Sequence, residues 1–201
     1  MNDLSFGPIP AEAVHVCVDM QRIFLEPGPW FGEAGLALIG PIKRLASGPW
    51  PTLWTRFITA ETPADATGCW RRYYDHWHAV TQKTAGADVL DLHPDLAPLA
   101  EPGSVHDKRV HDAFDSPSFV EHLDRVKPPA LILSGVETDV CVLATALSAV
   151  DLGYRTIVVT DAVASSDRAS HDACLRHIYP RFDQQIELVT TDVVLATGDA
   201  A

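Results

Sequence analysis

Residues 130–151 read ALILSGVETDVCVLATALSAVD and contain the clearest signals of secondary structure in the chain. The apolar run at 130–133 has the length and composition of a buried strand, and Ser134-Gly135 ends it. From Val140 onward, apolar residues recur at spacings of three and four, which places them on one face of a helix. The stretch therefore predicts a buried strand, a tight turn and an amphipathic helix in succession.

The position of Cys141 at the start of this helix suggests a nucleophile. We expect Thr138 or Asp139 to cap the helix, because a side-chain oxygen there accepts a hydrogen bond from an unpaired backbone N–H. Cys141 then falls within or just after the first turn, where the helix dipole and free N–H groups favour the thiolate. Free cysteines are also among the most buried residues and commonly act as small hydrophobic side chains. Position alone therefore leaves a nucleophile and a core residue as alternatives.

Apolar runs alternate with amphipathic stretches along the rest of the chain. The predicted strands are residues 14–18, 51–57, 104–108, 155–161 and 185–189, and the predicted helices are 36–46, 70–82, 118–126, 167–178 and a short one from Asp192. The stretch 70–82 is rich in aromatic and charged residues, so it is either a partly exposed helix or a lid or pocket wall. This alternation indicates an α/β fold, a three-layer sandwich in which a mostly parallel six-stranded sheet is flanked by helices on both faces. We expect the 201 residues to form one domain, with a core over about 13–190 and a loose N-terminal arm over 1–12.

Three chemically different side chains fall at the carboxyl ends of predicted strands or beside them. Asp19 follows the strand 14–18, Lys108 ends the strand 104–108, and Cys141 follows the strand that begins at residue 130. The carboxyl ends of parallel strands share one edge, where open α/β sheets bind ligands. Taken singly, Asp19 is as typical of a turn and Lys108 of a solvated surface. Their convergence with Cys141 predicts a catalytic crevice.

Composition excludes several classes of function. The net charge of −12 and the absence of a Lys/Arg cluster argue against a nucleic-acid surface, and no apolar stretch approaches a membrane span. The N-terminal MNDLSFGPIP has neither a basic flank nor an apolar run, so we expect no signal peptide and a cytoplasmic location. The four cysteines are scattered without a C-x-x-C pair, which favours reduced thiols.

Four motifs resemble those of the isochorismatase-like cysteine hydrolases, and the resemblance runs from about residue 14 to 189. The motifs are VDMQ at 18–21, Lys108 followed six residues later by Phe114, GVETDVCV at 135–142 and LGYRTIVVTDAVASS at 152–166. The family includes nicotinamidases, N-carbamoylsarcosine amidohydrolase, biuret and ureidoacrylate hydrolases, and isochorismatase itself.

The resemblance implies an Asp-Lys-Cys triad of Asp19, Lys108 and Cys141. It also implies a cis peptide between Val136 and Glu137 that turns the Glu137 N–H toward the Cys141 N–H, so that the two form an oxyanion hole. In this mechanism Asp19 takes the thiol proton, Lys108 favours the anionic forms of both groups, and Cys141 attacks the carbonyl carbon.

Two departures from the family pattern affect the expected substrate. Metal-binding nicotinamidases carry Asp-x-His and a further His after the second strand, whereas this chain has Arg56-Phe57-Ile58-Thr59-Ala60-Glu61, so we expect no metal and no other cofactor. The family's frequent Tyr-Ser-Ala-Phe is replaced by His111-Asp112-Ala113-Phe114, which changes the expected pocket wall. The candidate substrate contacts are Phe24, Trp30, Arg56, Trp70, Tyr74, His111 and Gln185.

Three classes of function remain open from the sequence. The leading one is a cysteine hydrolase that cleaves a C–N bond of a small amide, ureide or carbamoyl compound through a thioester. The second is a vinyl-ether hydrolase of the isochorismatase type, which needs no thiol, and the third is a non-catalytic or thiol-redox α/β module. We expect the protein to bind a small-molecule substrate. We also expect it to form a homo-oligomer, either a dimer or a tetramer.

Overall fold

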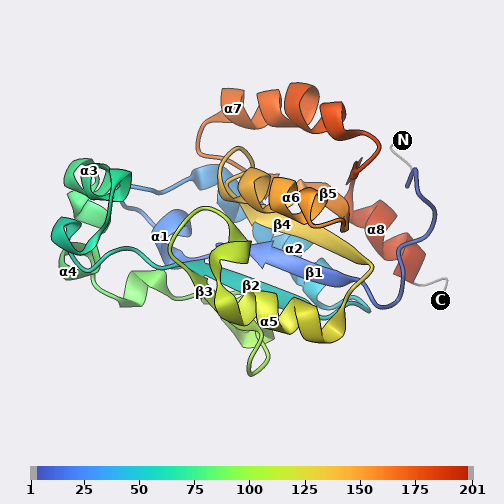
Figure 1. Ribbon diagram of the computed structural model, residues 1–201, viewed down its shortest axis with the longest axis horizontal. Coiled ribbons are helices and arrows are strands. Elements are labelled where there is room, and N and C mark those ends of the chain that lie inside the picture. The colour runs from blue at the N-terminus through green and yellow to red at the C-terminus, as the bar shows by residue number, and fades with distance from the viewer. Residues whose placement is uncertain (1–3, 199–201) are drawn as a thin grey trace.

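A six-stranded parallel sheet forms the centre of the computed structural model, which describes residues 4–198 (Figure 1). The strands lie in the order β3-β2-β1-β4-β5-β6, and every neighbouring pair is parallel. The strands are β1 (Val14–Val18), β2 (Thr52–Phe57), β3 (Val105–Lys108), β4 (Ala130–Val136), β5 (Arg155–Ala164) and β6 (Ile186–Val189). The predicted fold class is confirmed.

Helices cover both faces of this sheet, as the buried strands require (Figure 1). The helices are α1 (Arg22–Leu25), α2 (Ile39–Ala46), α3 (Cys69–His76), α4 (Gln82–Ala85), α5 (Pro117–Val126), α6 (Cys141–Asp151), α7 (Arg168–Ala173) and α8 (Thr191–Gly198). One core packs α2 and α8 on the sheet, and a second packs α5, α6 and the segment after α7 on the opposite face. Alternate residues of β1 separate the two cores, because Cys17 belongs to the first and Val16 to the second.

The chain between β2 and β3 leaves the sheet and packs beyond the carboxyl ends of the strands. It contains α3 and α4 and holds its own small core, in which Ile23 of α1 contacts Tyr74, Val80 and Leu90 (Figure 1). The single helix predicted over 70–82 is wrong here, because the structure breaks it at Trp77, where the backbone leaves helical geometry. This excursion supplies one wall of the site described below.

The strand β4 is longer than the sequence pattern indicated. Ser134-Gly135 was expected to end it, but the strand continues to Val136. Gly135 adopts φ +106°, and a Cβ there would lie 2.0 Å from the backbone oxygen of Val18 on the neighbouring strand. Glycine at this position allows β4 to approach β1 closely and carries the chain onward to the edge where β1 ends.

The helix predicted over 36–46 differs from the expectation in its first turns. The predicted helix 36–46 begins as a tight 3-10 helix (Glu33–Leu38) and becomes α-helical only at Ile39, which leaves Pro41 in the first turn, where its missing N–H costs nothing.

The N-terminal segment is held rather than loose from Gly7 onward, because the Arg155 guanidinium donates to the Gly7 and Pro8 carbonyls at 2.6 and 2.9 Å. Residues 1–3 of the predicted arm lie outside the described residues. Between residues 4 and 198, no helix is both long enough and apolar enough to cross a membrane.

Candidate active site

Asp19 and Lys108 form a fully buried ion pair at the carboxyl edge of the sheet. Asp19 directly follows β1, Lys108 is the last residue of β3, and β2 lies between these two strands. Lys108 Nζ is 2.6 Å from Asp19 Oδ2, and both side chains are 0% exposed. Lys108 Nζ also donates to the Val110 carbonyl at 3.1 Å and lies 4.9 Å from the centroid of the Phe57 ring. Lys108 is therefore not the solvated surface lysine that its sequence position also allowed.

Thr55 and Gln21 fix the position of Asp19. The Thr55 hydroxyl donates to Asp19 Oδ1 at 2.6 Å and accepts from the Asp19 backbone N–H at 3.2 Å. Gln21 binds both backbone groups of Phe57, which ties the end of β1 to the end of β2. Asp19 has φ +53°, a left-handed conformation that aspartate tolerates better than most residues. Thr55 is absent from the predicted site, because in the sequence it is only a threonine within an otherwise apolar strand.

The two carboxylate oxygens of Asp19 have different partners. Oδ1 accepts from the Thr55 hydroxyl, whereas Oδ2 faces the Lys108 ammonium at 2.6 Å. A carboxylate that is held by these two groups and buried beside a thiol is suited to act as a base.

Cys141 begins α6 at the same carboxyl edge of the sheet. It follows a short loop whose side chains form hydrogen bonds with the chain after β5. The capping prediction is wrong: α6 has no side-chain cap, because the Thr138 hydroxyl pairs with His171 Nδ1 at 2.8 Å and Asp139 accepts from the Ser165 hydroxyl at 2.6 Å. Both candidate caps therefore anchor the loop to the chain after β5. Cys141 is 6% exposed, so its thiol is nearly closed to bulk water.

The resting thiol of Cys141 is protonated. Burial raises its pKa above the ordinary value, the Asp19 carboxylate raises the pKa further, and Lys108 lowers it by a smaller amount. The direction of this shift is opposite to the effect that the prediction assigned to the helix start, namely stabilisation of the thiolate. Attack by this sulfur requires a base that removes the proton as the bond forms.

Two backbone N–H groups near Cys141 are unpaired. The Glu137 carbonyl accepts from the N–H groups of Val140 and Val142 at 3.1 and 3.0 Å. Within the described part of the chain, neither the Glu137 N–H nor the Cys141 N–H donates a hydrogen bond to another protein group. The peptide bond between Val136 and Glu137 is cis. Glu137 and Cys141 both line the cavity described next.

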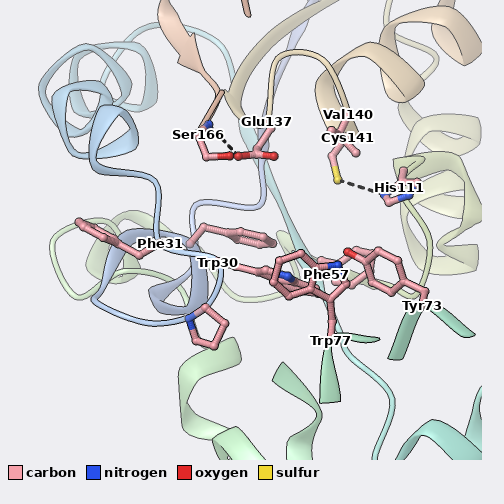
Figure 2. A pocket seen from close by; sticks show the side chains of 12 residues that line it. Trp30, Phe31, Phe57, Tyr73, Trp77, His111, Glu137, Val140, Cys141 and Ser166 are labelled. Carbon is pink, nitrogen blue, oxygen red and sulfur yellow. Dashed lines mark hydrogen bonds between the residues drawn. The ribbon is translucent and has the colours of Figure 1, made fainter. Parts of the chain in front are cut away.

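A cavity of about 380 Å³ opens beside Cys141 (Figure 2). One side is formed by Cys141, Val140, Glu137, Ser166 and His111, and Figure 2 shows the aromatic residues on the opposite side. The aromatic lining residues are Phe24, Trp30, Phe31, Phe57, Tyr73 and Trp77, and Pro29 completes the wall. Phe24 and Trp30 stack nearly parallel, with ring centroids 5.7 Å apart.

Three of the seven predicted substrate contacts line this cavity, namely Phe24, Trp30 and His111. Trp70 lies behind the wall, with its ring centroid 5.0 Å from that of His111. Arg56, Tyr74 and Gln185 do not line the cavity, and each absence has a physical reason.

Arg56 points away from the cavity and pairs with Asp107 and Asp91, at 2.8 and 3.0 Å. Tyr74 is buried in the small core around α3. Gln185 precedes β6, so it lies at the amino edge of the parallel sheet, opposite Cys141. The predicted substrate contacts did not include Phe31, Phe57, Tyr73 and Trp77. Tyr73 and Trp77 belong to the aromatic stretch 70–82, for which a lid or pocket wall was one interpretation, and Phe57 is the last residue of a predicted strand.

His111 lies beside the Cys141 thiol at the cavity wall. Its Nδ1 lies 3.9 Å from Cys141 Sγ (Figure 2), and its ring stacks on Phe57. Burial lowers the pKa of His111 and the positive charge of Lys108 lowers it further, against a weaker opposing effect of Asp19. The imidazole is therefore neutral near pH 7.

The residues present do not fit a metal site of the Asp-x-His type. Over residues 4–198, no group of three or more His, Cys, Asp or Glu side chains is close enough to share an ion. The stretch 56–61, where that motif was expected, begins with Arg56 near the end of β2, and the Arg56 guanidinium is already paired with two carboxylates.

Comparison with known proteins identifies relatives over nearly the whole chain. The family model described as the isochorismatase domain matches residues 13–191. Probable hydrolase YcaC of Escherichia coli (strain K12) is 39% identical over 69 residues, which is 34% of this chain and 30% of that protein. Alignments with two further curated relatives cover 39% and 29% of their lengths. The aligned regions thus span about a third of these relatives.

Solved structures match over a larger share of the chain. A cysteine hydrolase from Pseudomonas syringae pv. phaseolicola 1448A superposes with a TM-score of 0.77 at 20% identity, covering 98% of this chain and 99% of that one. N-carbamoylsarcosine amidase from Thermoplasma acidophilum gives a TM-score of 0.67 at 22% identity, covering 90% and 96%. At these identities the likeness establishes the shared fold.

Proposed function

The chain belongs to the isochorismatase family, and from this premise we propose that it is a cysteine hydrolase. Its reaction is cleavage of a C–N bond in a small amide, ureide or carbamoyl compound through a thioester on Cys141. Asp19 and Lys108 complete the catalytic triad, and the N–H groups of Glu137 and Cys141 receive the oxyanion. Two proteins that share the fold are named as a cysteine hydrolase and an amidase, in agreement with this reaction.

The observation that carries the proposal is the buried Asp19–Lys108 pair beside the Cys141 thiol. Lys108 Nζ is 2.6 Å from Asp19 Oδ2, both groups perturb the pKa of Cys141, and burial raises that pKa, so attack by the sulfur requires a base. Buried ionisable groups that perturb one another in this way cluster at catalytic sites. A structural cysteine needs no carboxylate and no cation beside it.

In the acylation step, Asp19 takes the proton from Sγ while Sγ attacks the carbonyl carbon, and the carbonyl oxygen becomes an oxyanion. The unpaired Glu137 and Cys141 N–H groups donate to that oxyanion. The C–N bond then breaks, the leaving nitrogen takes the proton held by Asp19, and ammonia or an amine departs. The products of this half-reaction are the free amine and a Cys141 thioester.

In the deacylation step, a water molecule enters the place that the amine has left. Asp19 takes a proton from the water as its oxygen attacks the thioester carbon, and the same two N–H groups stabilise the second oxyanion. The C–S bond breaks, the proton returns to Sγ, and the acid is released. Lys108 holds Asp19 in place throughout, and its positive charge favours the anionic state of the pair.

Release of ammonia from a panel of small amides, ureides and carbamoyl compounds tests the proposal, with Cys141→Ala as the control. We expect turnover of at least one compound by the wild-type protein and none by Cys141→Ala. Turnover that is undiminished in Cys141→Ala would contradict the thioester and would indicate a reaction that needs no thiol, such as vinyl-ether hydrolysis. A panel that releases no ammonia at all would indicate a non-catalytic module.

A further inference from the structure

The wall of the cavity beside Cys141 combines aromatic rings with a single carboxylate. Six of its twelve lining residues are Phe, Trp or Tyr, and they gather on the side opposite Glu137 (Figure 2). Glu137 is the only lining residue with a carboxylate, and no Lys or Arg lines the cavity. The bound molecule therefore meets aromatic rings on one side and a negative charge on the other.

The carboxylate of Glu137 is fixed but not fully satisfied. Its Oε1 accepts from the Ser166 backbone N–H at 2.8 Å, which holds the side chain on the side of the cavity opposite the aromatic rings (Figure 2). Among the described residues, Oε2 has no hydrogen-bond or ion-pair partner. One oxygen is thus available to a ligand.

The positive charges near the cavity cannot serve an anionic ligand. The Lys108 side chain is 0% exposed and already paired with Asp19. His111 lines the cavity, but its imidazole is neutral because burial and Lys108 lower its pKa. A carboxylate-bearing substrate would therefore be desolvated beside Glu137 with no counter-charge, which is costly.

A positively charged nitrogen fits these walls. Aromatic faces attract alkylated ammonium groups through their quadrupoles, and a nearby carboxylate adds a Coulomb attraction. The net charge of −12 also draws cations toward the protein as a whole. A neutral group of the same shape gains only the apolar contact.

We infer that the substrate carries a cationic, N-alkylated nitrogen at its non-reacting end, which lies between Glu137 and the aromatic wall while its amide faces Cys141. This inference rests on the proposed function for the placement of the amide. The selection of a cation by the cavity is a separate property, which binding alone can test.

The test uses two molecules of nearly identical shape. Trimethylammonioacetamide carries a quaternary nitrogen, and 3,3-dimethylbutanamide replaces that nitrogen with carbon. Calorimetric titration of Cys141→Ala with each avoids turnover. Because cation–π attraction at a desolvated site is about 1–2 kcal/mol and each 1.4 kcal/mol is tenfold, we expect the cation to bind about tenfold tighter or more.

Variants identify the source of the preference. In the Cys141→Ala background, Glu137→Gln keeps the acceptor for Ser166 but removes the charge, and should lower the preference several-fold; Trp77→Leu should lower it as well. Glu121→Gln, on the exposed side of α5, removes the same charge from the net total and should leave the preference unchanged.

Each outcome separates the two proposals. Equal affinity for the two molecules, weaker binding of the cation, or a preference that Glu137→Gln does not reduce would overturn the inference. The wild-type protein is then assayed for ammonia release from the same pair. If the cation is preferred in binding but neither it nor any amide of the panel is hydrolysed, the cation site stands and the proposed reaction fails.

Discussion

Replacement of Lys108 by Met should destabilise the protein strongly, because it leaves a carboxylate buried without its counter-charge. Lys108 Nζ and Asp19 Oδ2 are 2.6 Å apart and both side chains are 0% exposed. At an effective dielectric constant of about 20, two charges at that separation attract by about 6 kcal/mol, and much of this offsets their desolvation. The loss on removing one partner of such a pair is about 3–5 kcal/mol.

Thermal and urea unfolding measure this loss, with the double variant Asp19→Asn/Lys108→Met as the matched control. For a chain of this size we expect Lys108→Met to lower Tm by about 6–20 °C. The double variant should recover most of the loss, because it buries no charge. A loss below about 1 kcal/mol in the single variant, or additive losses in the double variant, would refute the ion pair as described.

The same pair predicts how stability changes at alkaline pH. Burial on its own would lower the pKa of Lys108, but Asp19 and then Cys141 outweigh it, so the net pKa is raised. A raised folded-state pKa contributes stability that is fully present below the unfolded value, about pH 10, and is lost as the pH rises through the folded value. Wild-type stability should therefore fall in this alkaline range by more than that of Lys108→Met, and parallel curves would contradict the raised pKa.

Three further predictions test the mechanism and the sheet. Asp19→Asn should lower turnover by about a hundredfold or more, and Asp19→Asn/Cys141→Ser should be scarcely slower than Cys141→Ser alone, because residues of one catalytic unit are not additive; multiplying losses in steady-state kinetics would argue against Asp19 as the base. Gly135→Ala should lower the free energy of unfolding in urea by about 3 kcal/mol or more, because its Cβ would lie 2.0 Å from the Val18 oxygen. The control Gly153→Ala, with φ +87° and nothing within 4 Å, should lower it by about 1 kcal/mol. Equal losses would show that the close approach is not what requires glycine at position 135. EDTA should leave ammonia release unchanged, and loss of activity that zinc or iron restores would reveal a metal that the residues after β2 do not suggest.

The sheet could be predicted from the sequence because its signals are local. Buried strands such as Val14–Val18 are short apolar runs rich in β-branched residues, and their alternation with amphipathic helices indicates parallel order. The strand ends then place Asp19 and Lys108 on one edge without any knowledge of distances. The end of β4 could not be predicted, because the role of Gly135 depends on Val18, a residue far away in the sequence.

The wall of the cavity could not be predicted for a similar reason. The excursion between β2 and β3 has no strand that fixes its direction, so whether Trp77 or Trp70 faces Cys141 depends on how that segment packs against α1. The prediction of a side-chain cap for α6 was wrong because of a competing interaction. Thr138 and Asp139 are good caps in isolation, but here they form hydrogen bonds with His171 and Ser165. The pKa of Cys141 likewise depends on burial, which a helix start alone does not report.

The most direct test of the central claim, that Cys141 carries the acyl group, is the mass of the intact protein during turnover. An amide that releases ammonia is mixed with excess protein, quenched in acid within one turnover and analysed by mass spectrometry. We expect a species heavier by the acyl group, located by peptide mapping to the segment that contains Cys141 and absent from Cys141→Ala. Single-turnover ammonia release with no such species, together with undiminished release by Cys141→Ala, would contradict the account.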